Sequence, residues 1–248
     1  MRFFIELSYN GKPYHGWQIQ NEVNSVEGQL EYCLSKLLNT SINIVGAGRT
    51  DRGVHAKQMF AHFDFEEKIS SNFVNRLNLF LPKSIYVSNI FPVKKHIHAR
   101  FNALIRTYKY YLTSEKNPFL QDFSWHCFYP LDIQRMNKAS QILMKYKDFS
   151  SFCKKNNKNK KNNICDIYHA DWSRNKIHFC FTIEANRFLR NMVRSIIGTL
   201  IDVGRVKISI NKFIKIIELK DPTYCSSPSV PACGLFLTKI IYPEDIFL

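Results

Sequence analysis

Two kinds of apolar periodicity alternate along this chain, and their order constrains its fold more than any other feature. Residues 2–10 and 85–93 alternate as strands do, whereas residues 25–38 and 73–81 place apolar side chains at helical spacing. The series strand, helix, strand, strand, helix, strand is followed by a second, similar series. This order predicts an α+β fold with much antiparallel pairing.

The two halves of the chain share this element order. The other predicted strands are residues 41–47, 59–65, 106–113, 164–173, 176–185 and 235–242. The other predicted helices are residues 132–147, residues 188–204 and a segment that starts after Ser209. The predicted N-caps are Ser25, Asp132 and Ser209. We expect the boundary between the halves near residues 100–110, and therefore divide the chain into 1–103 and 104–248.

The chain is strongly basic. Its 248 residues include 35 Lys and Arg against 20 Asp and Glu, which gives a net charge of +15. The run KKNNKNKK at 154–161 is typical of a solvated loop, and removing its five lysines still leaves a net charge of +10. The balance indicates a polyanionic partner. A compositional bias that loads the surface with lysine is the alternative.

Composition and cysteine usage exclude several other classes. With 45% hydrophobic and 14% aromatic residues, the chain has the material for a core that a disordered basic tail lacks. No run approaches 18 apolar residues, so we expect no membrane span. The opening MRFFIELSYNGK is interpreted as a first strand, not as a signal peptide. The seven cysteines include no C-x-x-C pair, which predicts reduced thiols in the cytoplasm.

The segment GAGRTDRGVHA at 46–56 is the strongest chemical signal. Its glycines let the backbone take unusual torsions and let a ligand come close. Asp51 lies between Arg49 and Arg52, and neighbouring cations favour an ionised carboxylate. Such a carboxylate can act as a nucleophile on a sugar carbon. A capping Asp in a structural turn is the alternative interpretation.

Other chemical motifs do not fit the chain. A dinucleotide-binding fingerprint needs a third glycine where Asp51 stands, and neither a P-loop nor a G-x-S-x-G elbow is present. His96 and His98 lack a nearby set of Cys or acidic ligands, so we predict no metal site. A glycosidase would need a second carboxylate facing Asp51.

The motif at 48–56 and several other segments together resemble a known family. GRTDRGVHA is similar to the catalytic motif of the tRNA pseudouridine synthase A family. The companion segments, which follow the family's order, are SYNGKPYHGWQIQ at 8–20, NLFLP at 78–82, HARFNA at 98–103, RTYKYYL at 106–112, DFSSF at 148–152, NRFLRNMVRSIIGTLIDVG at 186–204 and GLFL at 234–237. The resemblance therefore covers nearly the whole chain.

The resemblance implies a fold, an activity and a partner. The fold is two α/β halves related by a pseudo-twofold axis around a shared, mainly antiparallel sheet with helices on one face. Such enzymes isomerise uridine to pseudouridine in the anticodon arm of tRNA, at positions 38 to 40, and use no cofactor and no metal. The active form is a homodimer, and the tRNA contacts both protomers.

The resemblance also implies roles for three side chains. Asp51 matches the catalytic aspartate, which attacks C1′ of the sugar to form a glycosyl ester or, alternatively, attacks C6 of the base. Tyr108 matches the tyrosine that stacks on the target base. Arg194 matches the arginine that pairs with the carboxylate, and an Arg on an otherwise apolar helix stripe needs such a partner.

The remaining implied roles concern RNA. Arg49, grouped with the catalytic residues, is expected to contact a phosphate or the flipped nucleotide. Arg52, Arg187 and Arg190 are candidate RNA contacts. Cys165 stands where the family usually has an arginine, which affects one RNA contact and not the chemistry.

Two functions follow from these residues. The first is an isomerase that modifies tRNA through Asp51. The second is a non-catalytic tRNA-binding protein on the same scaffold. The intact set of Asp51, Tyr108 and Arg194 favours the isomerase, because a degenerate binder has less reason to keep it.

Overall fold

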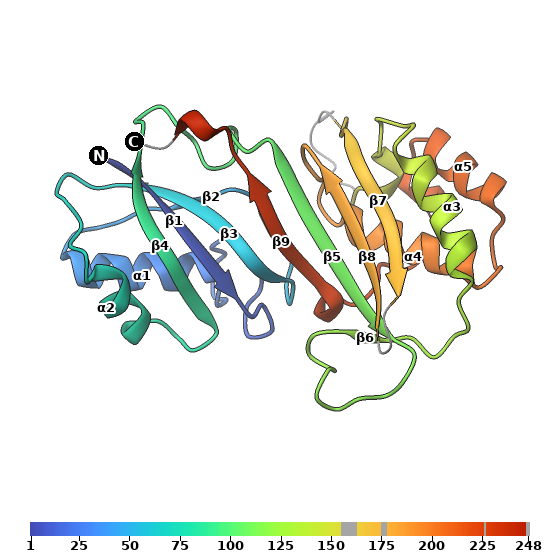
Figure 1. Ribbon diagram of the computed structural model, residues 1–248, viewed down its shortest axis with the longest axis horizontal. Helices are drawn as coiled ribbons and strands as arrows, with labels where there is room; N and C mark the ends of the chain where they lie inside the picture. The colour runs from blue at the N-terminus through green and yellow to red at the C-terminus, as the bar shows by residue number, and fades with distance from the viewer. Residues whose placement is uncertain (155–162, 175–177, 226, 247–248) are drawn as a thin grey trace. The chain divides into compact units, whose positions relative to one another are not determined.

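The computed structural model describes residues 1–154, 163–174, 178–225 and 227–246 (Figure 1). The chain divides into two compact units, which are Met1–Arg106 together with Phe236–Leu248, and Thr107–Leu235. Each unit combines helices with β-strands, and the strand pairing is mainly antiparallel. The predicted α+β class is confirmed.

β1 (Arg2–Tyr9) is a central strand of the first unit. It pairs antiparallel with β3 (His55–Asp64) on one side and with β4 (Ile85–Val93) on the other. The short β2 (Val45–Gly46) pairs antiparallel with β3, and β9 (Leu235–Ile241) pairs parallel with the beginning of β3. The motif segment between β2 and β3 therefore leaves the sheet and returns to it.

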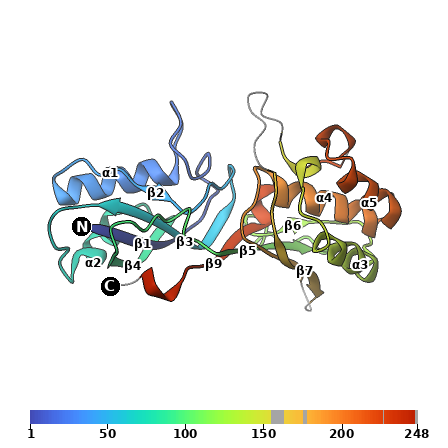
Figure 2. The ribbon, with the colours of Figure 1, turned by 90° about the horizontal axis from the view of Figure 1, so that it is seen from above.

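The helix α1 (Val26–Leu38) begins where the sequence predicts. The Ser25 hydroxyl accepts a hydrogen bond from the Gly28 N–H at 3.2 Å and so caps the first turn. The helix lies on one face of the sheet (Figures 1 and 2). Its buried residues are Val26, Leu30, Cys33 and Leu34. A second helix, α2 (Phe73–Phe80), packs beside β4.

The second unit has strands of its own. Its strand order is β5 (Ile105–Thr113), β8 (His178–Ala185), β7 (Ile167–Arg174), and β7 pairs antiparallel with β8. The short β6 (Trp125–His126), which the sequence analysis does not predict, pairs parallel with the end of β5. Because β6 contributes only two residues to the pairing, it lacks the alternation that marks a strand in sequence.

Three helices complete the second unit, namely α3 (Ile133–Leu143), α4 (Met192–Gly204) and α5 (Ile210–Glu218). The side chains of Asp132 and Ser209 cap α3 and α5, as predicted. α3 packs against β7, and α4 contacts both α3 and α5. α4 is accordingly the most apolar helix of the unit and is buried along almost its whole length.

The prediction for the start of α4 is wrong by about one turn. The helix begins at Met192 and not at Phe188, because Asn191 has a left-handed backbone with φ 65°. The Asn191 side-chain amide donates hydrogen bonds to the hydroxyls of Ser195 and Ser229, at 3.2 and 2.7 Å. These tertiary bonds stabilise a break that helical periodicity does not reveal.

No helix within the described ranges is long and apolar enough to cross a membrane. The free thiols include Cys33, Cys127, Cys165, Cys225 and Cys233. Most of the lysine-rich run at 154–161, interpreted as a loop, lies outside the described residues.

His62, on β3, is a buried histidine whose surroundings disfavour the charged form. Its Nδ1 accepts a hydrogen bond from the Ala99 N–H at 3.1 Å. Burial lowers the pKa of His62 to about 4, and the charges of Arg2 and His98 act in the same direction, while Asp64 opposes them. The imidazole is therefore neutral in the folded protein at neutral pH.

We predict that His62 makes the free energy of unfolding depend on pH. The unfolded chain takes up a proton below the ordinary pKa of 6.5, whereas the folded chain does so only near 4. As pH falls through this window, the wild type should lose stability relative to His62→Asn by up to about 1.4 kcal/mol per pH unit. Asn keeps an acceptor for Ala99 but does not titrate. Urea unfolding at about pH 7.5, 6 and 5 measures the difference, which must change with pH if the prediction holds.

Candidate active site

The loop that carries Asp51 joins β2 to β3 and has little regular secondary structure. Asp51 is half-buried, whereas the side chains of Arg49 and Arg52 are exposed. Thr50, between them, is buried. The loop thus offers a partly accessible carboxylate and two accessible guanidinium groups within a few consecutive positions.

The end of β1 and the turn after it hold this loop by hydrogen bonds. The hydroxyls of Tyr9 and Thr50 share a buried hydrogen bond of 2.8 Å. The Trp17 N–H donates to the Thr50 carbonyl at 3.2 Å, and the Gly53 N–H donates to the Tyr14 carbonyl at 3.3 Å. The aspartate is therefore bracketed on both sides by residues tied to the same distant segment.

Two glycines in the turn after β1 allow its backbone to approach the backbone of the Asp51 loop closely. Gly16 has a φ of +100°, and a Cβ added there would lie 2.4 Å from the Thr50 carbonyl oxygen. A Cβ at Gly11 would lie 2.0 Å from the Val54 carbonyl oxygen. Real Cβ atoms do not come this close to backbone atoms, so these positions exclude a side chain.

His55 and Arg106 fix the two ends of the motif, and the sequence analysis assigned a role to neither. His55 Nδ1 accepts a buried hydrogen bond from the Gly11 N–H at 3.1 Å, and its ring stacks on Phe236 with centroids 4.6 Å apart. The Arg106 guanidinium donates to the Ala47 carbonyl at 3.1 Å. The sequence does contain a signal that could have identified them, because both residues lie within segments that carry the family resemblance.

Tyr108 lies on β5 of the second unit and is half-buried. Its ring packs in a T-shaped arrangement with the ring of Phe188, with centroids 5.2 Å apart and planes at 90°. Tyr110, two residues further along the same strand face, is fully buried and donates its hydroxyl to the Pro231 carbonyl at 2.9 Å. Burial raises the pKa of Tyr110 far above the usual range of a tyrosine. Tyr108 is therefore the tyrosine of this face that a substrate can reach.

Arg194 lies in the first turn of α4 and is half-buried. Its Nε donates to the Val230 carbonyl at 2.7 Å, and the Val230 N–H donates back to the Arg194 carbonyl at 3.3 Å. A Cβ at Gly198, one turn further along α4, would lie 2.2 Å from the Pro228 carbonyl oxygen. The segment that contains Pro228 and Val230 thus lies directly on the helix and orients the guanidinium.

Arg187 and Arg190 lie in the irregular segment before α4. Arg190 is exposed and Arg187 is half-buried. Cys165, at the position where the family pattern has an arginine, is fully buried. Burial raises the pKa of the Cys165 thiol to about 11, and the charge of Arg187 opposes that rise. Cys165 has no surface to offer to RNA, and Arg187 is the cation that acts on it electrostatically.

The described residues also bear on metal binding. Among those residues, no group of three or more His, Cys, Asp or Glu side chains is placed to hold a metal ion. The chemistry available to this set of side chains is that of a carboxylate, a tyrosine ring and several guanidinium groups.

Comparisons with known proteins assign the chain to a family. A family model described as tRNA pseudouridine synthase matches residues 139–243. Among similar proteins named tRNA pseudouridine synthase A, that of Azobacteroides pseudotrichonymphae genomovar. CFP2 is 52% identical over 247 residues, which are 99% of this chain and 98% of the relative. The chain belongs to the tRNA pseudouridine synthase A family. The proteins of Parabacteroides distasonis and Thermoanaerobacter sp. (strain X514), with the same name, are 48% and 38% identical over 99% and 96% of this chain and 98% of each relative.

Membership of the tRNA pseudouridine synthase A family confirms the resemblance seen in the motifs. The residues that the family pattern implies are divided between the two units. Asp51, with Arg49 and Arg52, belongs to the first, and Tyr108 and Arg194 belong to the second. The pairing of Asp51 with Arg194 stays a prediction.

We predict that Gly16→Ala will disturb the Asp51 loop. The added methyl group meets the Thr50 carbonyl, and alanine is strained at φ +100°, so the free energy of unfolding should fall by about 1–3 kcal/mol. Denaturant unfolding measures this change. Gly48→Ala is the matched control on the loop itself, because a Cβ at Gly48 has nothing within 4 Å. Equal losses of stability in the two variants would contradict the close-approach argument.

Proposed function

We propose that this protein isomerises uridine to pseudouridine in the anticodon stem-loop of tRNA, at positions 38 to 40, with Asp51 as the nucleophile. The observation that carries the proposal is the full-length similarity to proteins named tRNA pseudouridine synthase A. The position of Asp51 supports it, because a half-buried carboxylate beside exposed cations can meet an anionic substrate without being fully solvated.

The first step of the proposed reaction breaks the glycosidic bond. An Asp51 carboxylate oxygen attacks C1′ of the ribose, and the bond between C1′ and N1 of uracil breaks. Its electron pair leaves with the base as a uracil anion, while the sugar becomes an ester of Asp51. Attack on C6 of the base is the alternative chemistry for the same carboxylate.

The second step joins the base to the sugar through a different atom. After the base turns, C5 attacks C1′, the ester bond breaks, and the carboxylate is regenerated. The proton on C5 is then lost and N1 gains one, so the product is an isomer of uridine. Tyr108 serves as a platform on which the base stacks while it turns, and the T-shaped contact with Phe188 helps to keep the tyrosine ring in place.

Cations stabilise the charges in this scheme. Arg194 pairs with the Asp51 carboxylate, and its bond to the Val230 carbonyl orients it for that purpose. Arg49 binds a phosphate or the flipped nucleotide. Extracting a base from its stack costs a few kcal/mol, which contacts with the RNA backbone must offset. Arg52, Arg187 and Arg190 are the candidates for those contacts.

The proposal assigns one part of the reaction to each half of the chain. The half 1–103 supplies the aspartate loop, and the half 104–248 supplies the stacking tyrosine and the helix with Arg194. We further propose that the protein acts in the cytoplasm as a homodimer, with the anticodon arm of one tRNA contacting both protomers.

The proposal predicts release of tritium from tRNA labelled at C5 of uridine, because forming the new bond expels that hydrogen. Wild-type protein should release it to water, and Asp51→Asn should reduce the single-turnover rate at least about 1,000-fold. The loss arises because an amide is a far weaker nucleophile than a carboxylate.

Asp245→Asn is the matched control for that experiment, because it removes an exposed carboxylate from the same unit. It should release tritium at the wild-type rate. Wild-type protein that binds tRNA without releasing tritium would favour the non-catalytic binding protein. Release by Asp51→Asn at the wild-type rate would show that another group is the nucleophile.

We also predict that tRNA binding will weaken steeply with salt. The net charge of +15 implies several contacts with phosphates, each of which releases counterions on binding. With about four such contacts, raising the salt from about 50 to 200 mM should weaken Kd roughly 100-fold. Filter binding measures Kd, and thermal unfolding at both salt concentrations checks that the protein stays folded. An unchanged Kd would refute the electrostatic contribution.

A further inference from the structure

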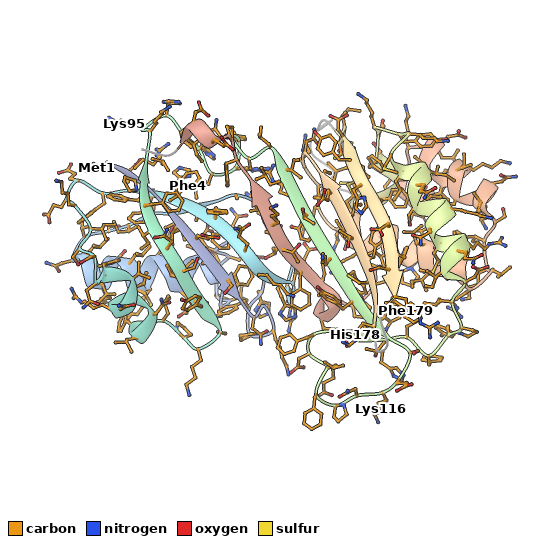
Figure 3. All side chains as sticks on the ribbon, in the orientation of Figure 1. Met1, Phe4, Lys95, Lys116, His178 and Phe179 are labelled. Carbon is orange, nitrogen blue, oxygen red and sulfur yellow. The ribbon has the colours of Figure 1, made fainter. Side chains whose placement is uncertain are left out.

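The loop between β4 and β5 is a second basic segment of the first unit, separate from the Asp51 loop. Residues 94–106, which are this loop and the first two residues of β5, contain Lys94, Lys95, Arg100 and Arg106, and no Asp or Glu. Lys95, labelled in Figure 3, points outward from this part of the chain. An ion pair of 4.0 Å joins Lys94 to Asp245 of another element. Because this pair involves only one of the four cations, the segment as a whole is cationic.

Its backbone is held in place by its own side chains. The His98 N–H donates to the Asn102 side-chain oxygen at 2.7 Å, and the Asn102 N–H donates back to the His98 carbonyl at 3.1 Å. The Arg100 N–H donates to His98 Nδ1 at 3.1 Å. These bonds close a tight turn around residues 98–102.

The same turn is anchored to the body of the unit. Buried His62 accepts the Ala99 N–H, and the Tyr242 hydroxyl donates to the Ala99 carbonyl at 2.6 Å. The Arg106 guanidinium donates to the Arg100 and Ala103 carbonyls at 2.6 and 2.9 Å. A loop fixed by so many bonds loses little further conformational entropy when it binds a partner.

Two side chains project from this rigid turn. Phe101 is 75% exposed and Arg100 is also exposed. The His98 ring lies against Phe101 with centroids 4.3 Å apart, and the Arg100 guanidinium lies 5.8 Å from the centre of the same ring. Most of the aromatic surface is thus open to solvent beside a cation, although apolar surface is normally buried.

We propose that Arg100 and Phe101 form a tRNA contact site, in which an unpaired base stacks on the Phe101 ring and the Arg100 guanidinium binds a phosphate. This inference rests on the proposed function, in which tRNA is the substrate. An aromatic ring next to a cation, on a segment without carboxylates, is the combination that binds single-stranded nucleic acid. Because the segment is positively charged, it favours a polyanion as its partner over a protein surface that lacks acidic residues.

The test measures Kd for unmodified tRNA by filter binding, with tritium release followed in the same samples. Phe101→Ala should weaken Kd roughly 5- to 100-fold, because the stacked base loses its partner. Phe101→Trp should restore Kd to within about threefold of the wild type, since a larger ring stacks at least as well. The single-turnover rate at saturating enzyme should stay within about twofold in both variants, because neither touches the reacting atoms.

Arg100→Ala tests the cation separately. It should weaken Kd and lower the slope of log Kd against log salt by about one, as expected for one lost phosphate contact. Leu79→Ala and Arg76→Ala are the matched controls, because both alter exposed positions of α2 in the same unit. These two variants should bind tRNA as the wild type does.

The outcomes separate this site from the enzyme activity. A folded Phe101→Ala protein that binds tRNA as tightly as the wild type overturns the proposed site. Weak binding by Phe101→Trp as well overturns the stacking role. Wild-type protein that binds tRNA but releases no tritium overturns the proposed function, while a loss of affinity in Phe101→Ala would still support the contact site.

Discussion

The approach of one backbone to another around the Asp51 loop is the constraint on which the rest of the candidate site depends. The loop has little secondary structure, so its shape comes from bonds that join Thr50 and Gly53 to the end of β1 and the turn after it. The backbone at Gly16 can approach Thr50, and that at Gly11 can approach Val54, because neither glycine carries a Cβ. In the proposed reaction, the half-buried Asp51 carboxylate is positioned by this frame before substrate arrives, which spares the reaction the entropy of ordering it.

The second unit positions its side chains by the same means. Arg194 is oriented by a carbonyl of the segment that lies against α4, and Gly198 lets that segment approach. Tyr108 packs edge-to-face with Phe188, which comes from the irregular segment before α4. In both units, irregular segments carry or support the proposed chemistry, and the sheets and helices supply rigid ends for them.

Features that depend on neighbouring residues were predictable from the sequence. Ser25, Asp132 and Ser209 were identified as helix caps because a cap needs only its own side chain and the next turn of backbone. The start of α4 was not predictable, because the left-handed Asn191 is stabilised by Ser229, which is distant in sequence. The two-residue strand β6 has no periodicity to detect, since its pairing with β5 depends on tertiary position.

The sequence by itself determined the α+β class, the basic character and, through GRTDRGVHA and its companion segments, the family and the residues to examine. Motifs can do this because residue type and spacing are local properties. Only the tertiary structure decided that His55 and Arg106 support the aspartate loop, that Cys165 is buried, and that Phe101 is displayed on a rigid turn. Those outcomes depend on which distant backbone atoms meet a side chain, and spacing along the chain does not contain that information.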